Sequence, residues 1–362
     1  MTWEFGINDA ATVNKWSEAV IRDAEKQLFF APFMTSMTEG AMRSPDAAKG
    51  NGIIRVHSEF AGMDKKGRTL TLHNVADIEA AEQGIQGDAL LRDTGADLDV
   101  YTMTLKYDAI AQQVRSSGLM SEKSTVLDFR MQAKDKLGRF ARFKTEGAIW
   151  LALNGLTSWN NTTKLKHWPQ NGALASVYGN TIQAFDSAHI SYAGSATSSA
   201  TVTSGDTMSA QYLTKLETLA FEDLDIPLEG MDVDGQPELI LFLSRRGCEQ
   251  LMYDADWINA NRAGPQSTDN PIVKRSIGKF GMIRVVPYDF CLNLAANVSQ
   301  AILCGRDALQ MAKVEDFSWF EDFEDTRKRR KVISIGGMFG VAATYLNSTR
   351  RNAIAVRHWV RS

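Results

Sequence analysis

The sequence predicts an α+β fold that is built from more than one compact part. Strand-like segments at residues 53–107 precede one long helical segment, and a mixed region is then followed by further short strands. This order lacks the regular strand–helix alternation that produces a doubly wound parallel sheet. The chain of 362 residues is also long for one domain, since domains usually contain about 100–200 residues. We therefore predict two or three compact units.

The composition is that of an ordinary globular protein. Hydrophobic residues make up 44% of the chain and charged residues 23%, which excludes a disordered chain, a collagen and a simple coiled coil. The 40 basic and 43 acidic side chains leave a net charge of −3. A protein whose main task is to grip DNA or an anionic membrane is usually strongly basic. The three cysteines fit neither a disulfide framework nor a zinc motif, so we expect free thiols in a reducing compartment.

Neither a signal peptide nor a membrane span is predicted. Residues 1–12 contain Glu4 and Asp9 and lack both a basic start and an apolar core. The longest uncharged tract, residues 332–349, contains three glycines and several hydroxyl and amide side chains. A membrane span needs about 20 mostly apolar residues. We instead expect this tract to form buried strands around a turn at residues 336–337.

Residues 1–49 are predicted to form an arm that consists of one amphipathic helix and extended chain. Apolar residues recur at helical spacing, and they are Val13, Trp16, Val20, Ala24 and Leu28. The arm has few other apolar groups with which to build a core. We expect its stripe to pack elsewhere in its own subunit or on a neighbour, which makes Trp16 a candidate contact residue.

A β-hairpin is predicted from the strand-like runs at residues 53–60 and 69–75, which a Gly- and Lys-rich turn separates. In an antiparallel pair the register can be given as the sum of the two paired residue numbers. For sums of 128, 130 or 132, one face of the hairpin is mostly apolar and the other polar, as a half-buried ribbon requires. The run at residues 97–107 is expected to return along this hairpin. Lys65 and Lys66 lie at the predicted tip and are candidate contacts between copies of the chain.

The best candidate for a metal site lies on the polar face of this hairpin. If paired numbers sum to 130, His57 and His73 lie opposite each other, about 5 Å apart at Cβ, and Glu59 is close by. A shared ion would make a metal-dependent hydrolase one functional hypothesis. No fourth ligand is evident, so we favour a solvated or subunit-contact face without a metal or other cofactor. Signatures of nucleotide binding, zinc proteases and serine hydrolases are also absent, and no enzymatic activity is expected.

Residues 121–154 carry the strongest helix signal in the chain. The segment contains no proline, and its apolar positions step by three and four along Val126, Phe129, Ala133, Leu137 and Phe140. Gly155 suits the end of the helix. A helix of this length spans about 45–50 Å at 1.5 Å per residue, which exceeds most single-domain cores. We therefore predict a structural beam.

The second half of the chain is predicted to be mixed. Residues 156–206 are poor in periodicity, and the Ser/Thr-rich stretch at 195–204 suggests a loop or a loosely held insertion. The elements expected after it are a helix at 208–223, a strand at 238–243, a helix capped by Ser244 with Leu251 and Met252 facing inward, a strand at 279–287, and short strands from about residue 300.

An acidic block near the C-terminus is followed almost directly by a basic block. The residues of these blocks that are candidate contacts between copies are Glu321, Asp322, Glu324, Asp325, Arg327, Arg329 and Arg330. Blocks of opposite charge in one chain complement each other between copies. The alternative is a solvated face, since exposed ion pairs contribute only about 0–1 kcal/mol. The acidic block disfavours a nucleic-acid site because it repels phosphate.

Several segments, in order along the chain, resemble the major capsid proteins of tailed bacteriophages, in particular the podophage type that includes the N4-like coat proteins. The early segments are GRTLTLHNV, LDVYTMTLKYDAIAQQV and SGLMSEKSTVLDFRMQAKDKLGRF. The later ones are IPLEGMDVDGQPELILFLSRRGCEQLMYDADWINANRA, DNPIVKRSIGKFGMIRVVP and the tail from AILCGRDALQMA to AVRHWV. The match is one of size and polarity, and its specificity comes from the order of the segments.

The resemblance implies an HK97-like major capsid fold, which is α+β. The implied parts are an N-terminal arm (1–49), an extended β-hairpin loop (50–108), a peripheral domain with spine helix 121–154 and the Ser/Thr-rich insertion (109–207), an axial domain (208–305), and peripheral strands with a C-terminal return (306–362).

The resemblance also implies a function in virion assembly. Copies of such a protein form the hexamers and pentamers of an icosahedral capsid that encloses double-stranded DNA without sequence specificity, and they assemble in the host cytoplasm. The expected partners are other copies, a separate scaffolding protein, a portal and a decoration protein, with no membrane. An encapsulin-like nanocompartment shell of the same fold is the nearest alternative. No catalytic Glu can be assigned for a covalent crosslink through Lys65 or Lys66.

Overall fold

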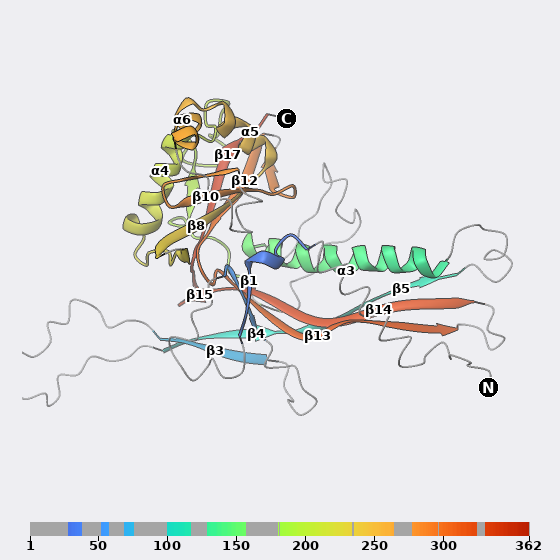
Figure 1. The fold of residues 1–362 in the computed structure, drawn as a ribbon. Helices are drawn as coiled ribbons and strands as arrows, with labels where there is room; N and C mark the ends of the chain where they lie inside the picture. Colours follow the sequence, from blue (N-terminus) through green and yellow to red (C-terminus); the bar gives the residue numbers. More distant parts are fainter. Residues whose placement is uncertain are drawn as a thin grey trace, which may run out of the picture.

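The computed structural model describes residues 28–37, 52–57, 69–75, 100–116, 129–156, 180, 182–233, 235–263, 277–295, 297–323 and 330–361. These residues form two bodies, each built around one sheet, and a long helix runs along one of them (Figure 1). None of the helices in these ranges is both long and apolar enough to cross a membrane.

The first body, which we call the elongated body, consists of a five-stranded sheet and helix α3. The strand order is β1-β2-β13-β14-β5. The bounds are β1 Met34–Met37, β2 Ile54–His57, β13 Leu309–Phe323, β14 Lys331–Ala343, β5 Asp108–Arg115 and α3 Phe129–Leu153. Strand β2 is parallel to both β1 and β13, whereas β14 is antiparallel to both β13 and β5. A short 3-10 helix, Ala31–Phe33, leads into β1.

Helix α3 confirms the predicted beam from Phe129 onward, while residues 121–128 lie outside the described ranges. Its apolar stripe covers the sheet in a small cluster formed by Ala133, Leu137, Ala141, Trp319, Ile333 and Ile335. The helix ends at Leu153, and the predicted stop residue Gly155 follows it with a φ of 69°, which is costly for any residue with a side chain. The amide of Gly155 bonds to the Ala152 carbonyl at 3.2 Å, and that of Leu156 bonds to the Leu151 carbonyl at 3.0 Å. This is the Schellman ending.

The second body, which we call the compact body, contains an eight-stranded sheet flanked by short helices. The strands are β6 Ile190–Tyr192, β17 Ala353–Trp359, β12 Val298–Cys304, β8 Gln236–Leu243, β10 Ile283–Pro287 and β9 Gly278–Phe280 in spatial order, with β11 Leu292–Ala295 beside β12 and β7 Met231–Val233 beside β8. The helices are α4 Ala210–Thr218, which continues into a π-helical turn at Leu219–Asp223, α5 Arg245–Tyr253 and α6 Ala255–Ala263.

The predicted start of α5 is confirmed by its cap. Ser244 Oγ accepts a hydrogen bond from the Gly247 amide at 3.2 Å, as an N-cap residue should. Leu251 is buried, but Met252 is 51% exposed, so its predicted inward orientation is wrong. The strand expected at residues 279–287 is two strands, because Gly281 turns the chain between β9 and β10 at a φ of 57°.

The predicted hairpin between residues 53–60 and 69–75 is wrong. Strand β2 lies between β1 and β13 and is largely buried, as a parallel interior strand must be. Strand β3, Thr69–Val75, pairs instead with β4, Val100–Lys106, in a separate two-stranded sheet. The expected return of the 97–107 run along 69–75 is therefore confirmed. The alternation of apolar and polar residues depends only on the strand itself, whereas the strand with which it pairs can be distant in sequence. The pattern therefore predicts the faces of β2 but not its partner.

The turn predicted at residues 336–337 is also wrong, because β14 runs through both glycines without a break. A Cβ on Gly337 would lie 3.1 Å from the Phe317 ring, and one on Gly340 would lie 1.9 Å from the Lys106 carbonyl oxygen. These glycines allow a side chain and a neighbouring backbone to approach the strand closely.

The two bodies share one hydrophobic core. It contains Ile54 and Val341 from the five-stranded sheet, Ile240 and Phe242 from the eight-stranded sheet, and Trp150 from α3. Aromatic rings gather there, with Trp150 and Tyr288 only 4.4 Å apart between ring centroids. Continuous packing of this kind fixes the orientation of the bodies relative to each other.

Candidate assembly surfaces and the joint between the bodies

Besides the passage through α3, two short connections join strands of one sheet to strands of the other. Residues 305–308 join β12 to β13, and residues 344–352 join β14 to β17 through the small strands β15 Tyr345–Leu346 and β16 Thr349–Arg350. The non-glycine residues of the described chain that have a positive φ all lie in these connections, and they are Asp307, Asn347, Ser348 and Asn352. Such conformations persist only where the surroundings determine them strongly.

Side-chain hydrogen bonds tie the two connections to each other. Asn352 Nδ2 donates to the Arg306 carbonyl at 2.7 Å, and Asn352 Oδ1 accepts from the Glu229 amide at 3.1 Å. Thr344 Oγ1 donates to the Asp307 carbonyl at 2.5 Å. Each bond joins segments that are distant in sequence, so the joint is clamped from several sides.

Arg350 fastens this joint to the end of α3. Its guanidinium is buried and donates to the Ala152 carbonyl at 2.8 Å and to the Leu153 carbonyl at 2.5 Å. The charge also lies 4.0 Å from the centre of the Phe185 ring. Burial lowers the pKa of Arg350 to about 9. The side chain therefore satisfies helix-end carbonyls that have no partner within the helix.

An ionic network continues from the joint to β2. Arg55 Nε donates to Asp307 at 3.1 Å, and the same two side chains form a second, shorter contact. Burial raises the pKa of Asp307 to about 6, although the charge of Arg55 opposes the shift. Glu229 pairs with both Arg306 and Arg351, the latter at 2.8 Å. The network links both bodies by charge as well as by packing.

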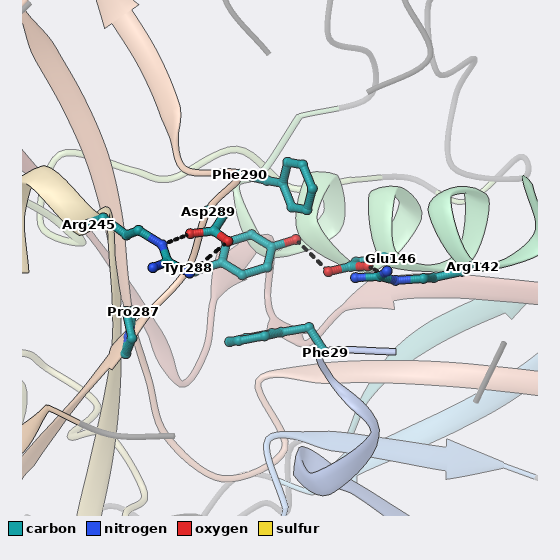
Figure 2. Close-up of a pocket in the computed structure, with 8 residues that line it drawn as sticks. All are labelled: Phe29, Arg142, Glu146, Arg245, Pro287, Tyr288, Asp289 and Phe290. Carbon is teal, nitrogen blue, oxygen red and sulfur yellow. Dashed lines mark hydrogen bonds and ion pairs between the residues drawn. The ribbon is translucent and has the colours of Figure 1, made fainter. Parts of the chain in front are cut away.

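A cavity of about 320 Å³ lies where α3 meets the compact body (Figure 2). Its walls are Phe29, Arg142, Glu146, Arg245, Pro287, Tyr288, Asp289 and Phe290. Glu146 pairs with Arg142 at 3.2 Å, and Arg245 pairs with Asp289. The Tyr288 hydroxyl points at Glu146 at 3.5 Å, and burial raises its pKa well above the usual value. Paired charges around a protonated phenol suit a structural junction better than acid–base chemistry.

The predicted metal candidates do not come together. His57 is buried on β2, with Nε2 2.7 Å from Gln310 Oε1, whereas His73 is exposed on β3 opposite Thr102. Glu59 lies outside the described residues. No group of three or more His, Cys, Asp or Glu side chains that could hold a metal ion occurs within the described ranges. The hydrolase hypothesis depended on the wrong strand pairing.

In the sequence, the charged blocks span the end of β13 and the start of β14. Glu321 is buried under α3, where its carboxylate is 2.5 Å from Arg130 and accepts from Trp319 Nε1 at 2.9 Å. Asp322 and Arg330 are exposed. The other candidate contact residues lie outside the described ranges, and they are Trp16, Lys65, Lys66, Glu324, Asp325, Arg327 and Arg329. Glu321 is thus engaged within its own chain, and contacts by the other residues remain predictions.

The β3–β4 hairpin is anchored at one end and projects from the elongated body (Figure 1). Met103 and Leu105 of β4 are buried in a cluster with residues of β13 and β14. Asn180 holds the Lys106 backbone, since its Oδ1 accepts from the amide at 2.6 Å and its Nδ2 donates to the carbonyl at 2.7 Å. Val100, at the other end of β4, is 52% exposed. The hairpin therefore offers surface to a partner while its root is fixed.

Asn180, Arg350 and Asn352 do not stand out in the sequence. Asn347-Ser348 and Asn352 are ordinary turn signals between strand-like runs, so the turns could have been predicted but not their contacts. The Ser/Thr-rich stretch is held more firmly than its composition suggests. Asp206 accepts hydrogen bonds from the amides of Ser195 and Thr203, at 3.1 and 2.7 Å.

Comparisons with known proteins agree on one family. A family model described as phage capsid protein matches residues 4–350. The capsid of Ralstonia phage GP4 matches with a TM-score of 0.72 and 22% identity, over 86% of this chain and 88% of that chain. The cyanophage Pam1 capsid matches with a TM-score of 0.67 and 18% identity, over 90% and 94%. The capsid of Helicobacter pylori bacteriophage KHP30 matches with a TM-score of 0.59 and 12% identity, over 91% and 90%.

A search of curated proteins found no match. The structural matches confirm the predicted HK97-like major capsid fold. The family model covers nearly the whole sequence in addition. The chain therefore belongs to the phage capsid protein family.

Proposed function

We propose that this major capsid protein is of the podophage, N4-like type and builds its icosahedral shell through elements that project from a rigid two-body core. The subtype is supported by the ordered sequence segments that resemble those coat proteins. The mechanism is assembly, in which many copies bury modest surfaces on one another. Obligate interfaces commonly bury about 2,000–5,000 Å², and projecting elements supply such area.

The single observation that carries the mechanism is the contrast between the core and the projections. The shared core and the clamped joint hold the two bodies together, whereas the β3–β4 hairpin and the far end of the β13–β14 ribbon extend from it (Figure 1). A subunit with a rigid centre and extended surfaces loses little conformational entropy when it assembles.

In this proposal the parts have separate roles. The compact body is the axial domain around hexamer and pentamer axes, and the elongated body is the peripheral domain. The β3–β4 hairpin is the extended loop, which begins after His57 because β2 belongs to the five-stranded sheet. The arm is residues 1–27, because Phe30 and Phe33 are buried in the shared core and β1 belongs to the five-stranded sheet. The C-terminal return ends in β17, inside the eight-stranded sheet.

We further infer the partners and the place of assembly. Other copies of the chain are the main partner, with a separate scaffolding protein, a portal and a decoration protein, and assembly occurs in the host cytoplasm. The chain has no enzymatic role. Its net charge of −3 suits a shell that holds DNA by enclosure rather than by sequence-specific contacts.

Negative-stain microscopy with light scattering tests this function. The chain is expressed alone and, in parallel, together with the scaffolding protein of its phage. We expect closed particles or curved sheets tens of nanometres across in at least the second sample. A strictly monomeric protein in both samples would contradict the proposal.

A further inference from the structure

Strand β5 forms the outer edge of the five-stranded sheet (Figure 1). Six of its eight residues are exposed. On one side it pairs with β14, and on the other side it pairs with no strand of the described chain. Such an edge presents a row of backbone donors and acceptors that another chain can pair with.

The β5 edge differs from the other side of the sheet, where β1 is the terminal strand and β13 extends beyond its pairing with β2. Within the described residues, β13 pairs beyond residue 312 only with β14, so its far half is an edge of the described sheet. That edge carries two irregularities of register and several charges, including Glu315 and Asp322, which are the usual protection against unwanted pairing. Strand β5 pairs with β14 over eight consecutive residues without a bulge, and residues 109–114 carry no charge. The β5 edge thus lacks the protection that the β13 edge has.

The direction of the backbone groups on β5 follows from one hydrogen bond. The Ser116 amide donates to the Lys331 carbonyl at 2.9 Å, just beyond the last pair of the ladder. Bonded and non-bonded pairs alternate in an antiparallel ladder. Even-numbered residues of β5 therefore bond to β14, and the backbone groups of residues 109, 111, 113 and 115 point outward.

We propose that this edge pairs with β5 of a second copy of the chain, antiparallel, about a two-fold axis at Gln112. This inference rests on the proposed shell function and names one of its contacts. A two-fold axis perpendicular to a sheet brings together residues on the same face, so paired numbers must sum to an even value. With the axis at Gln112, the numbers of two paired residues sum to 224. In this register every residue of β5 has a partner in the second copy. This register places Ile110 opposite Val114 of the second copy and brings no like charges together.

A second copy of the chain is the partner that fits this edge, because β5 is complementary to itself. The outward-pointing residues meet one another in this register, with residue 109 opposite 115 and residue 111 opposite 113. An isologous contact satisfies both edges at once, and every subunit of the shell carries the same strand. A strand from a scaffolding protein is the alternative that the experiments below separate.

A cysteine at the axis tests the pairing directly. Gln112 is exposed, so Gln112→Cys should not disturb folding. Across the axis the two residues form a non-bonded pair with Cα atoms about 4.5 Å apart, which is within the range for a disulfide. We expect mild oxidation of particles that contain Gln112→Cys to give a covalent dimer of the chain. Gln113→Cys is the matched control, because its equivalents lie diagonally, about 7–8 Å apart.

The native cysteines do not interfere with this reading, because Cys248, Cys291 and Cys304 are all buried. The particles should come from cells that produce the chain together with the other head proteins of its phage. A dimer from Gln112→Cys but not from Gln113→Cys supports the proposal. Closed particles in which Gln112→Cys gives no dimer overturn it, and they leave the shell function intact.

Charge variants at the same position give a second test. Gln112→Lys and Gln112→Glu each place like charges against each other at the axis, so each alone should yield several-fold fewer closed particles. Co-expression of the two variants should restore the yield, because Lys then meets Glu. Gln132→Lys, at an exposed position of α3, is the control and should assemble normally. If co-expression gives no recovery, β5 pairs with a different strand and the proposal is wrong.

Discussion

At the scale of single residues, the joint depends on side chains that lie in buried or strained positions. Arg350 has 1% of its surface exposed, yet it carries a charge into the core. Removing a charge from water is costly unless hydrogen bonds replace the lost hydration. The carbonyls at the end of α3 supply such bonds to Nη2, and burial still lowers the pKa of Arg350.

Replacement of Arg350 by Met should lower the free energy of unfolding by about 2 kcal/mol. The Leu153 carbonyl then loses this donor, while the Ala152 carbonyl keeps only the bond from the Gly155 amide. Urea denaturation of the soluble subunit, followed by circular dichroism, measures this. Arg350→Lys keeps the charge but has fewer fixed donors, so its free energy of unfolding should lie between those of the unchanged chain and Arg350→Met. An unchanged midpoint for Arg350→Met would contradict the capping role.

His358 should make the compact body sensitive to acid. Its ring is fully buried under the first turn of α5, and neither nitrogen has a hydrogen-bond partner. Burial lowers the pKa of His358 to about 4. The unfolded chain therefore binds this proton more tightly than the folded chain does. Stability should fall by about 3 kcal/mol as the pH drops from 6.5 through 4.

Denaturant titrations at several pH values measure this loss. His358→Leu removes the titrating group and should flatten that part of the pH profile. It should be at least as stable as the unchanged chain at pH 7, because it also removes two unpaired nitrogens. If the free energy of unfolding falls equally steeply with pH in both proteins below pH 6.5, the acid sensitivity does not come from His358.

Among single residues, the sequence predicts those with local roles. Ser244 and Gly155 are identified because capping and helix ending depend on neighbours in the chain. The roles of Arg350 and His57 depend on partners 198 and 253 residues away, which no local pattern encodes. The failed metal candidate has the same origin.

At the scale of elements, helix α3 contains a glycine that its packing does not require. A Cβ at Gly138 would meet no heavy atom within 4 Å. Gly138→Ala should therefore raise the free energy of unfolding by about 1 kcal/mol, since alanine is the better helix former. Differential scanning calorimetry of the subunit measures the shift.

Gly340→Ala in β14 is the contrasting variant. Its Cβ would lie 1.9 Å from the Lys106 carbonyl oxygen, so the root of the β3–β4 hairpin would have to move. This variant should be less stable than the unchanged chain. A loss of stability in Gly138→Ala would mean that the helix needs flexibility or space at that position.

The elements themselves are largely predictable, whereas strand pairing is not. The long helix, the β8 strand and the 69–75 and 97–107 pair follow from periodicity and from proximity in sequence. The sequence predicts the wrong partner for β2, because its neighbour β13 lies about 250 residues further along the chain. Glycines that permit close packing and glycines that turn the chain also look alike in a sequence.

At the scale of the whole molecule, the shared core and the clamped joint make the subunit one rigid unit with extended edges. Rigidity favours assembly, because each copy that enters the shell loses conformational entropy, and a rigid subunit loses less of it. The ordered resemblance to capsid proteins identifies the fold class, while composition alone indicates only a self-associating α+β protein. The relative placement of the two bodies depends on long-range contacts that only the structure reveals.

Family and fold together identify this chain as the subunit that forms the shell of a phage head. The most direct measurement is a symmetric cryo-electron microscopy reconstruction of particles purified with this protein. We expect the compact bodies to ring the five-fold and six-fold positions of a closed icosahedral shell built from many copies of the chain. Density for this fold at one vertex only, or a shell formed by another protein, would show that this chain is not the shell subunit.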